Sequence, residues 1–186
     1  VDIMSLQPQQ RLPRAIVLIG PRAVGKSTVG RALAEQLGFA FCDTDELLAA
    51  AAGVSAGAHL ALVGEVLFRR LEATVTLQAL VKARQTVLAL GGGAVTIPEV
   101  LSALLQPSLF VVFLFAPVAV LVQRLQQSPD LRPPLTSMPQ EAEVAALLSQ
   151  RLMLYERAAH LRLNAASLPV SELARQIALR CASFCD

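Results

Sequence analysis

A glycine-rich turn between an apolar stretch and a helical pattern constrains this chain more than any other feature. Residues 20–28 read GPRAVGKST, which fits the pattern G-x-x-x-x-G-K-[S/T]. Apolar residues fill Ala15–Ile19 before it, and Lys26–Leu37 after it repeats apolar residues at helical spacing. A strand that ends in such a turn presents backbone N–H groups to a phosphate, and the helix that follows adds the positive end of its dipole. The pattern therefore predicts a phosphate-binding strand–loop–helix unit, or P-loop.

The residues of this loop have separate tasks in that interpretation. Its two glycines permit the tight turn and a close phosphate approach, and Lys26 is expected to reach the β- and γ-phosphates. Ser27 is expected to offer its hydroxyl to Mg²⁺. The loop thus predicts ATP as co-substrate and Mg²⁺ as cofactor. The residues expected to bind ATP here are Gly20, Ala23, Val24, Gly25, Lys26, Ser27 and Thr28.

Size and composition narrow the class of protein further. A chain of 186 residues that is 54% hydrophobic favours one domain with a substantial core, at 15–186, after a flexible segment at 1–14. The net charge of +2 is too small to indicate nucleic acid or an anionic membrane as partner. The longest apolar run, 109–122, is shorter than the roughly 20 residues of a membrane span. Three scattered cysteines form no disulfide pattern, which favours the cytoplasm, and we expect a monomer.

Strand-like and helical stretches alternate along the chain. We expect strands at Ala15–Ile19, Phe39–Cys42, Thr86–Leu90, Leu109–Phe115 and Leu161–Leu163. We expect helices at Lys26–Leu37, Thr44–Ala52, Gly64–Ala83, Ile97–Leu105, Val118–Gln126, Gln140–Arg157 and Val170–Arg180. This alternation predicts an α/β fold, a three-layer α/β/α sandwich around a central, mostly parallel five-stranded sheet.

Two aspartates and three glycines follow expected strands. Asp43 and Asp45 come after the second strand, and Gly91, Gly92 and Gly93 come after the third. Ligands bind at the carboxyl ends of parallel strands, so both carboxylates should face the phosphate site. One can hold a metal's water shell, and the other can orient or deprotonate an attacking hydroxyl. Two simpler readings stay open: Asp43 as a helix cap, and the glycines as a loose turn.

Charged side chains elsewhere are less specific. Arg69 and Glu72 are three residues apart on an expected helix and can share a face, but a solvated surface is the simpler reading of that segment. The same holds for Arg151 on a later helix. Residues 128–139 contain four prolines and Arg132, without an apolar period. Loops of this length often carry function.

Taken together, these motifs resemble the shikimate kinase family, small P-loop kinases related in fold to nucleoside monophosphate kinases. The resemblance runs from about residue 15 to residue 180 and implies transfer of the ATP γ-phosphoryl group to the 3-hydroxyl of shikimate, in aromatic amino acid biosynthesis. It also implies substrate-binding helices at 44–84 and a lid at 128–139. It rests on six motifs in the family's order: GPRAVGKST, Asp43-Thr44-Asp45, GEVLFRRLE, LGGGAV, Arg132-Pro133, and Arg151 with Tyr155.

The resemblance implies a role for each matching residue. Lys26, Asp45 and Arg132 are the implied catalytic residues: Asp45 binds the accepting hydroxyl and is a candidate base, and Arg132 stabilises charge on the transferring phosphoryl group of ATP. Ser27 and, through water, Asp43 are implied to hold Mg²⁺. Paired guanidinium groups suit the acceptor's carboxylate. The implied substrate-binding residues are Asp45, Arg69, Glu72, Gly91, Gly92, Gly93 and Arg151.

One segment departs from the family's pattern and keeps other functions open. Residues 53–65 read GVSAGAHLALVGE, with departures at Val54, Ala56, Ala58, Leu60 and Val63. A kinase for another polyol acid such as gluconate is one alternative, and a ligand-sensing domain without turnover is another. The triple glycine with two placed arginines favours shikimate over gluconate, and over a nucleoside monophosphate as well. The presence of both Asp45 and Arg132 favours a kinase over a sensor.

Overall fold

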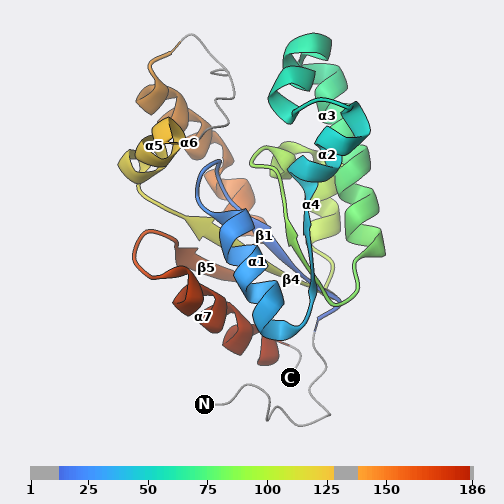
Figure 1. Cartoon of the computed structure of the whole chain (residues 1–186), viewed down its shortest axis with the longest axis vertical. Coiled ribbons are helices and arrows are strands. Elements are labelled where there is room, and N and C mark those ends of the chain that lie inside the picture. Colours follow the sequence, from blue (N-terminus) through green and yellow to red (C-terminus); the bar gives the residue numbers. More distant parts are fainter. Residues whose placement is uncertain (1–12, 128–137, 185–186) are drawn as a thin grey trace.

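Strands and helices alternate along the chain, as the sequence predicts. The structure, a computed structural model, describes residues 13–127 and 138–184 (Figure 1). The strands are β1 (Ala15–Ile19), β2 (Ala40–Asp43), β3 (Thr86–Ala89), β4 (Leu109–Phe115) and β5 (Leu161–Asn164). The helices are α1 (Lys26–Leu37), α2 (Thr44–Ala52), α3 (Ala56–Lys82), the 3-10 helix η2 (Ala94–Thr96), α4 (Pro98–Leu104), α5 (Val118–Gln127), α6 (Gln140–Ala158) and α7 (Val170–Ala182).

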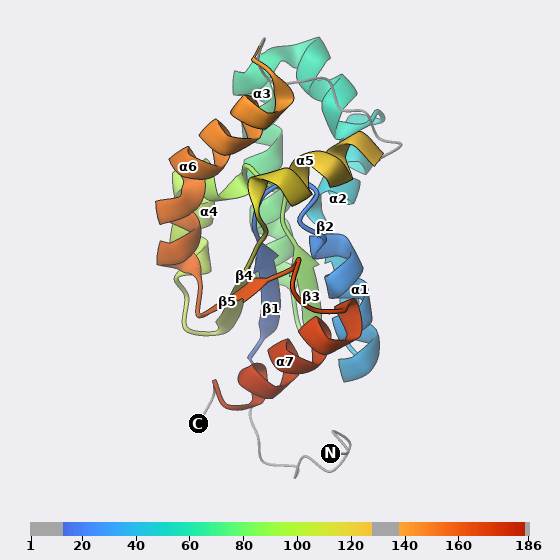
Figure 2. The ribbon, with the colours of Figure 1, turned by 90° about the vertical axis from the view of Figure 1, so that its left-hand side faces the viewer.

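The five strands form one parallel sheet in the order β2-β3-β1-β4-β5. Helices α1 and α7 cover one face, and α3, α4 and α6 cover the other (Figures 1 and 2). This is the predicted three-layer α/β/α sandwich, and the predicted mostly parallel sheet is parallel at every pairing in the described residues. Both faces are covered because each strand connects to the next parallel strand through a helix.

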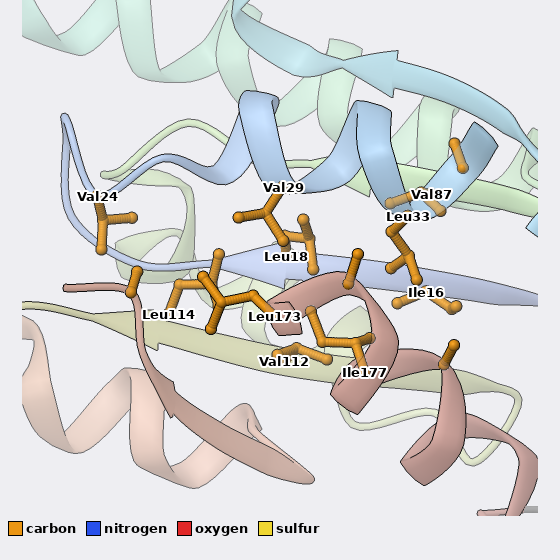
Figure 3. Packing of buried hydrophobic residues seen from close by; sticks show 14 of the residues in the cluster. Ile16, Leu18, Val24, Val29, Leu33, Val87, Val112, Leu114, Leu173 and Ile177 are labelled. Atoms are coloured by element: carbon orange, nitrogen blue, oxygen red, sulfur yellow. The ribbon is translucent and has the colours of Figure 1, made fainter. Parts of the chain in front are cut away.

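The central strands are apolar on both faces because each face lies against helices. In β1, Ile16 and Leu18 pack into the core under α1 and α7, whereas Val17 and Ile19 pack into the core under α3, α4 and α6. Successive side chains of a strand point to opposite faces, so an uninterrupted apolar run fills both cores. Figure 3 shows the first core, where side chains of α1 and α7, including Val29, Leu33, Leu173 and Ile177, meet those of β1 and β4.

Several boundaries differ from the sequence prediction by one or two residues, and the segment before Gly64 differs by more. The second strand lies one residue later, at Ala40–Asp43. Helix α3 has a first piece that the sequence did not predict, which begins at Ala56 because the Ser55 side chain accepts a hydrogen bond from Ala58 N and caps it. Gly64 has φ 76° and ψ 169°, outside the helical region, so it separates this piece by a kink from the helix predicted from Gly64 onwards.

Some predictions fall on residues that the structure does not describe. These are Arg132, the proposed lid apart from residues 138 and 139, and residues 1–12 of the expected N-terminal segment. They stay predictions from the sequence.

The longest apolar run of the sequence, 109–122, folds as β4 and the start of α5 and not as one helix. Within residues 13–127 and 138–184, no single helix is long and apolar enough to cross a membrane. Helices α2 and α3, which are bent by 79° relative to each other, are together long and apolar enough to do so, by length and composition only.

His160, the residue before β5, is joined to β4 by two hydrogen bonds. The His160 backbone N donates to Val111 O at 2.8 Å, and Val111 N donates to His160 Nδ1 at 3.0 Å. The ring also lies beside Phe110 and Phe184, with centroids 6.1 Å and 4.6 Å away. His160 is accessible to solvent, but its ring is partly buried by these contacts, and this burial lowers the pKa of His160 below its usual 6.5. The hydrogen bond from Val111 likewise requires Nδ1 to be unprotonated.

We therefore expect the free energy of unfolding to fall as the pH drops below about 6.5. The unfolded chain binds the proton more readily than the folded one, so the contribution of neutral His160 is present above that pH and lost below it. Urea unfolding between pH 5 and pH 8 measures this, and His160→Asn should flatten the acid side of the profile. His59→Asn, at the chain's other histidine, is the matched control. Equal pH profiles for wild type and His160→Asn would contradict the expectation.

Candidate active site

The P-loop connects β1 to α1 through backbone conformations that require glycine. Gly20 has φ +144°, and a Cβ built on it would lie 2.2 Å from the backbone oxygen of Leu114 in β4. Gly25, the residue before α1, has φ +102°. Residues other than glycine rarely adopt these backbone angles. At Gly20 no side chain could move to make room for a Cβ, because the nearest neighbour is a backbone oxygen. The two glycines of the motif are thus needed for the turn itself.

The lysine of the motif lies over the start of the loop. Lys26 Nζ donates to Gly20 O at 2.9 Å and to Pro21 O at 2.8 Å. Both acceptors are neutral carbonyl groups, which a phosphate oxygen outcompetes as a partner for an ammonium group. The side chain is therefore folded towards the loop that the sequence predicts to cradle phosphates.

Ser27, at the start of α1, and Asp43, at the end of β2, form a second polar group beside the P-loop. Ser27 Oγ donates to Asp43 Oδ2 at 2.6 Å, and Asp43 Oδ1 accepts from Asp45 N at 2.9 Å. The second bond caps α2, so the capping interpretation of Asp43 is confirmed. The first bond adds a contact to the P-loop that capping does not require. A hydroxyl and a carboxylate side by side provide the oxygen ligands that Mg²⁺ prefers.

A cavity of about 500 Å³ opens above the P-loop, here called the donor cavity. Its walls come from the P-loop, the end of β2, α5 and the start of α7. Asp43 and Asp45 both line it, as the sequence predicts for two carboxylates at the ends of parallel strands. The expected ATP-binding residues Ala23, Val24, Gly25, Lys26, Ser27 and Thr28 line it as well.

A second cavity of about 680 Å³, here called the acceptor cavity, lies between α3, α6 and the loop after β3. Three residues line both cavities: Arg22, Asp45 and Gly92. The two cavities therefore meet at these three residues, of which Asp45 is the one with a carboxylate. The predicted substrate-binding residues Asp45, Arg69, Glu72, Gly92, Gly93 and Arg151 line the acceptor cavity, together with the apolar residues Ala56, Leu60, Phe68 and Leu147.

An ion pair fixes one arginine of the acceptor cavity. Arg69 Nη1 donates to Glu72 Oε2 at 2.6 Å, and Arg69 Nη2 lies 3.6 Å from Glu65 Oε1. Glu72 is only 4% exposed. Burial raises the pKa of Glu72, and the charge of Arg69 and its hydrogen bond oppose that change. The buried carboxylate thus holds the guanidinium of Arg69 in one place at the cavity wall.

The three glycines after β3 leave room for charged side chains. A Cβ on Gly91 would lie 2.8 Å from Glu72 Oε1 and 2.9 Å from Asp45 Oδ1, and one on Gly93 would lie 2.2 Å from Arg69 Nη1. Gly91 N donates to Thr44 Oγ1 at 3.0 Å, which ties this loop to α2. The glycines are therefore more than a loose turn, because any larger residue would displace the groups that line the acceptor cavity.

One carbonyl group joins this loop to α6. Tyr155 Oη donates to Gly92 O at 2.6 Å, and Arg151 Nη1 donates to the same oxygen at 3.2 Å. The Tyr155 ring is buried and stacks on Phe113, with ring centroids 4.9 Å apart. Two donors from α6 therefore hold the Gly92 peptide, and with it the boundary between the two cavities.

Reasoning from the sequence missed three residues of this arrangement. Arg22 carries no signal, since it stands at a variable position of the motif. Thr44 and Tyr155 belong to motifs that were noticed, but their hydrogen bonds depend on contacts between distant elements. Arg124 donates to Val24 O at 2.9 Å and Ala165 O at 3.0 Å, which joins α5 to the P-loop and to the residue after β5.

Comparisons with known proteins agree with one another. The model of a family described as shikimate kinase matches residues 22–182. Shikimate kinase 2 of Shigella flexneri is 40% identical over 172 residues, which are 90% of this chain and 97% of that protein. The structure of shikimate kinase from Acinetobacter baumannii in complex with shikimate has a TM-score of 0.85 at 34% identity and covers 94% of this chain and 95% of its own. A gluconokinase from Sinorhizobium meliloti, with a TM-score of 0.57 at 20% identity over 94% of this chain and 95% of its own, shares the fold alone.

The hydroxyl of Tyr155 provides a direct test of this geometry. Burial raises the pKa of Tyr155 to about 12, and the neighbouring charge of Arg151 opposes this only in part. The chain has one tyrosine and no tryptophan, so the ultraviolet absorbance of tyrosinate reports this residue alone. We expect the absorbance of the folded protein to rise with a midpoint near pH 12, and that of the urea-unfolded chain near pH 10.

Because the pKa of Tyr155 is raised in the folded protein, we also expect the free energy of unfolding to fall at alkaline pH. Because the unfolded chain ionises first, the stabilising contribution of the neutral phenol is present below pH 10 and is lost above it. Circular dichroism should be recorded in parallel, to separate titration of the folded state from alkaline unfolding. Tyr155→Phe removes the signal and is the control. A midpoint near pH 10 while the circular dichroism is still native would show that the hydroxyl is not held against Gly92.

Proposed function

The chain belongs to the shikimate kinase family, and we propose that it is an active member that phosphorylates shikimate with ATP. The products are shikimate 3-phosphate and ADP. The observation that carries the proposal is the meeting of the donor and acceptor cavities at Asp45. A phosphoryl group can pass between two bound molecules only where their sites share such a boundary.

The donor cavity suits the triphosphate of ATP. Lys26 exchanges its bonds with Gly20 O and Pro21 O for bonds with the β- and γ-phosphates. Ser27 and Asp43 are the residues that would hold Mg²⁺, the Ser27 hydroxyl as a ligand and the Asp43 carboxylate through water. The ion would supply positive charge beside the phosphates. The backbone N–H groups of the loop and the start of α1 complete the electrostatic support.

Asp45 positions the acceptor. Its carboxylate accepts a hydrogen bond from the shikimate 3-hydroxyl, whose oxygen then forms a bond to the γ-phosphorus. The bond between that phosphorus and the oxygen bridging to the β-phosphate breaks, and ADP leaves with the electron pair. The proton of the hydroxyl passes to Asp45. Such transfers depend chiefly on alignment and on charge stabilisation, so a carboxylate at the boundary is placed where alignment matters.

Two arginines bind the carboxylate of shikimate. Arg69 and Arg151 approach the acceptor cavity from α3 and α6, and each is already oriented by a partner, Glu72 for one and Gly92 O for the other. Guanidinium groups held in place lose little freedom when they bind a carboxylate, which favours recognition of a small acid.

The other predictions from the sequence belong to the same proposal. The segment 44–84 acts as the substrate-binding part of the domain, and residues 128–139 act as a lid that brings Arg132 to the phosphates. Gly91 supports the acceptor cavity through its neighbours Asp45 and Glu72. A monomeric state and a cytoplasmic location stay predictions.

Release of ADP from Mg²⁺-ATP, measured with and without shikimate, tests the proposal. We expect turnover that depends on shikimate, and no turnover with gluconate in a parallel assay. Turnover with gluconate alone would reassign the acceptor. Binding of ATP without turnover on either acid would instead support a ligand-sensing domain.

Two variants separate the roles of the donor and acceptor groups. Asp45→Asn should lower kcat on the order of 100-fold or more while ATP affinity stays close to wild type, because it removes the group that aligns the hydroxyl. Lys26→Met should weaken both phosphoryl transfer and nucleotide affinity. The controls are Glu46→Gln, at an exposed acid beside Asp45, and Lys82→Met, at the chain's only other lysine. Full activity of Asp45→Asn would refute its role.

A further inference from the structure

The boundary between the two cavities carries a positive charge that no motif accounts for. Lys26 and Arg124 line the donor cavity, and Arg69 and Arg151 line the acceptor cavity. Among the cationic residues within 13–127 and 138–184, Arg22 is the one that lines both. It also lines a smaller cavity of about 40 Å³ between the P-loop and α6, together with Arg151 and Tyr155.

The backbone around Arg22 fixes its position at this boundary. A Cβ built on Gly92 would lie 3.2 Å from Arg22 N and 3.5 Å from Arg22 Cγ, so the P-loop and the glycine loop are in close contact there. The Gly92 peptide is held from α6 by Arg151 and Tyr155. The root of the Arg22 side chain therefore lies between two elements that the site already keeps in place.

A cation at this boundary has an electrostatic task. The triphosphate of ATP and the carboxylate of shikimate are both anionic, and Asp45 adds a third negative charge between them. Two anionic ligands in adjoining cavities repel each other, and the repulsion is strong where water is largely excluded. The transferring phosphoryl group also carries its charge across this boundary.

We infer that Arg22 couples the two substrates: its guanidinium lies between the γ-phosphoryl group and the acceptor, and it makes binding of either substrate favour binding of the other. The inference rests on the proposed function and adds to it a residue that acts on both substrates at once. Coupling of this kind is reciprocal, so ATP must raise the affinity for shikimate by the same factor as shikimate raises the affinity for ATP.

Calorimetric titrations test the coupling directly. Shikimate is titrated into the protein alone and into the protein saturated with a non-hydrolysable ATP analogue and Mg²⁺, and the ratio of the two Kd values is the coupling factor. We expect Arg22→Gln to lower this factor by about 5-fold or more, while the affinity for each ligand alone changes much less. The kcat for ADP release should fall by roughly 10-fold to 100-fold, and more than the KM values rise.

Two further variants separate charge from structure. Arg22→Lys keeps the charge and should restore most of the coupling, and Arg70→Gln removes an exposed arginine of α3 and should leave coupling and kcat unchanged. Binding of the ATP analogue alone confirms that each variant is folded. A coupling factor and a kcat that are unchanged in Arg22→Gln would overturn the inference. An equal loss in Arg22→Lys would overturn the electrostatic argument.

The wild-type assay separates this inference from the function on which it rests. Without shikimate-dependent turnover in wild type, the proposed function fails and the inference falls with it. With wild-type turnover and an unaffected Arg22→Gln, only the inference fails.

Discussion

The parallel pairing of β1 with β3 and β4 determines where the polar groups of the candidate active site meet. Leu18 is paired with Ala89 of β3, and Ala89 is paired with Asp43 of β2, so these strands end level with one another. The P-loop, the Asp43–Asp45 turn and the glycine loop therefore leave the sheet at the same edge. A shift of one residue would exchange the side chains of β1 between the two cores, and the close packing of both cores opposes it.

This constraint explains which parts of the site could be predicted from the sequence. Lys26, Asp43 and Asp45 stand directly after apolar strands, so the rule that ligands bind at the carboxyl ends of parallel strands places them together. The hydrogen bonds from Arg151 and Tyr155 to Gly92 O could not be predicted in that way, because they span 59 and 63 residues and depend on how α6 packs against the sheet. The fold was predictable because its strands are strongly apolar and glycine-rich turns follow two of them.

The errors and ambiguities have local physical causes. The prediction began a helix at Gly64 and omitted the helical piece before it, because that piece depends on the Ser55 cap and is separated from the rest of α3 by the non-helical Gly64. Arg69 looked like part of a solvated face because spacing alone cannot show whether a helix face meets water or a cavity. Its partner Glu72 is almost fully buried, which identifies that face as the wall of the acceptor cavity.

The segment that departs from the family's pattern divides into two groups in the structure. Val54 and Ala58 are exposed, whereas Ala56 and Leu60 line the acceptor cavity and pack with Leu48 and Phe68 in a small core of their own. These apolar side chains offer no hydrogen bonds to a polar acceptor. Recognition of the acceptor must then come mainly from the charged residues of the cavity, Asp45, Arg69 and Arg151. Such a site depends strongly on how its charges are held, which is why the bonds that fix Arg69, Arg151 and the Gly92 peptide weigh more here than the size of the cavity.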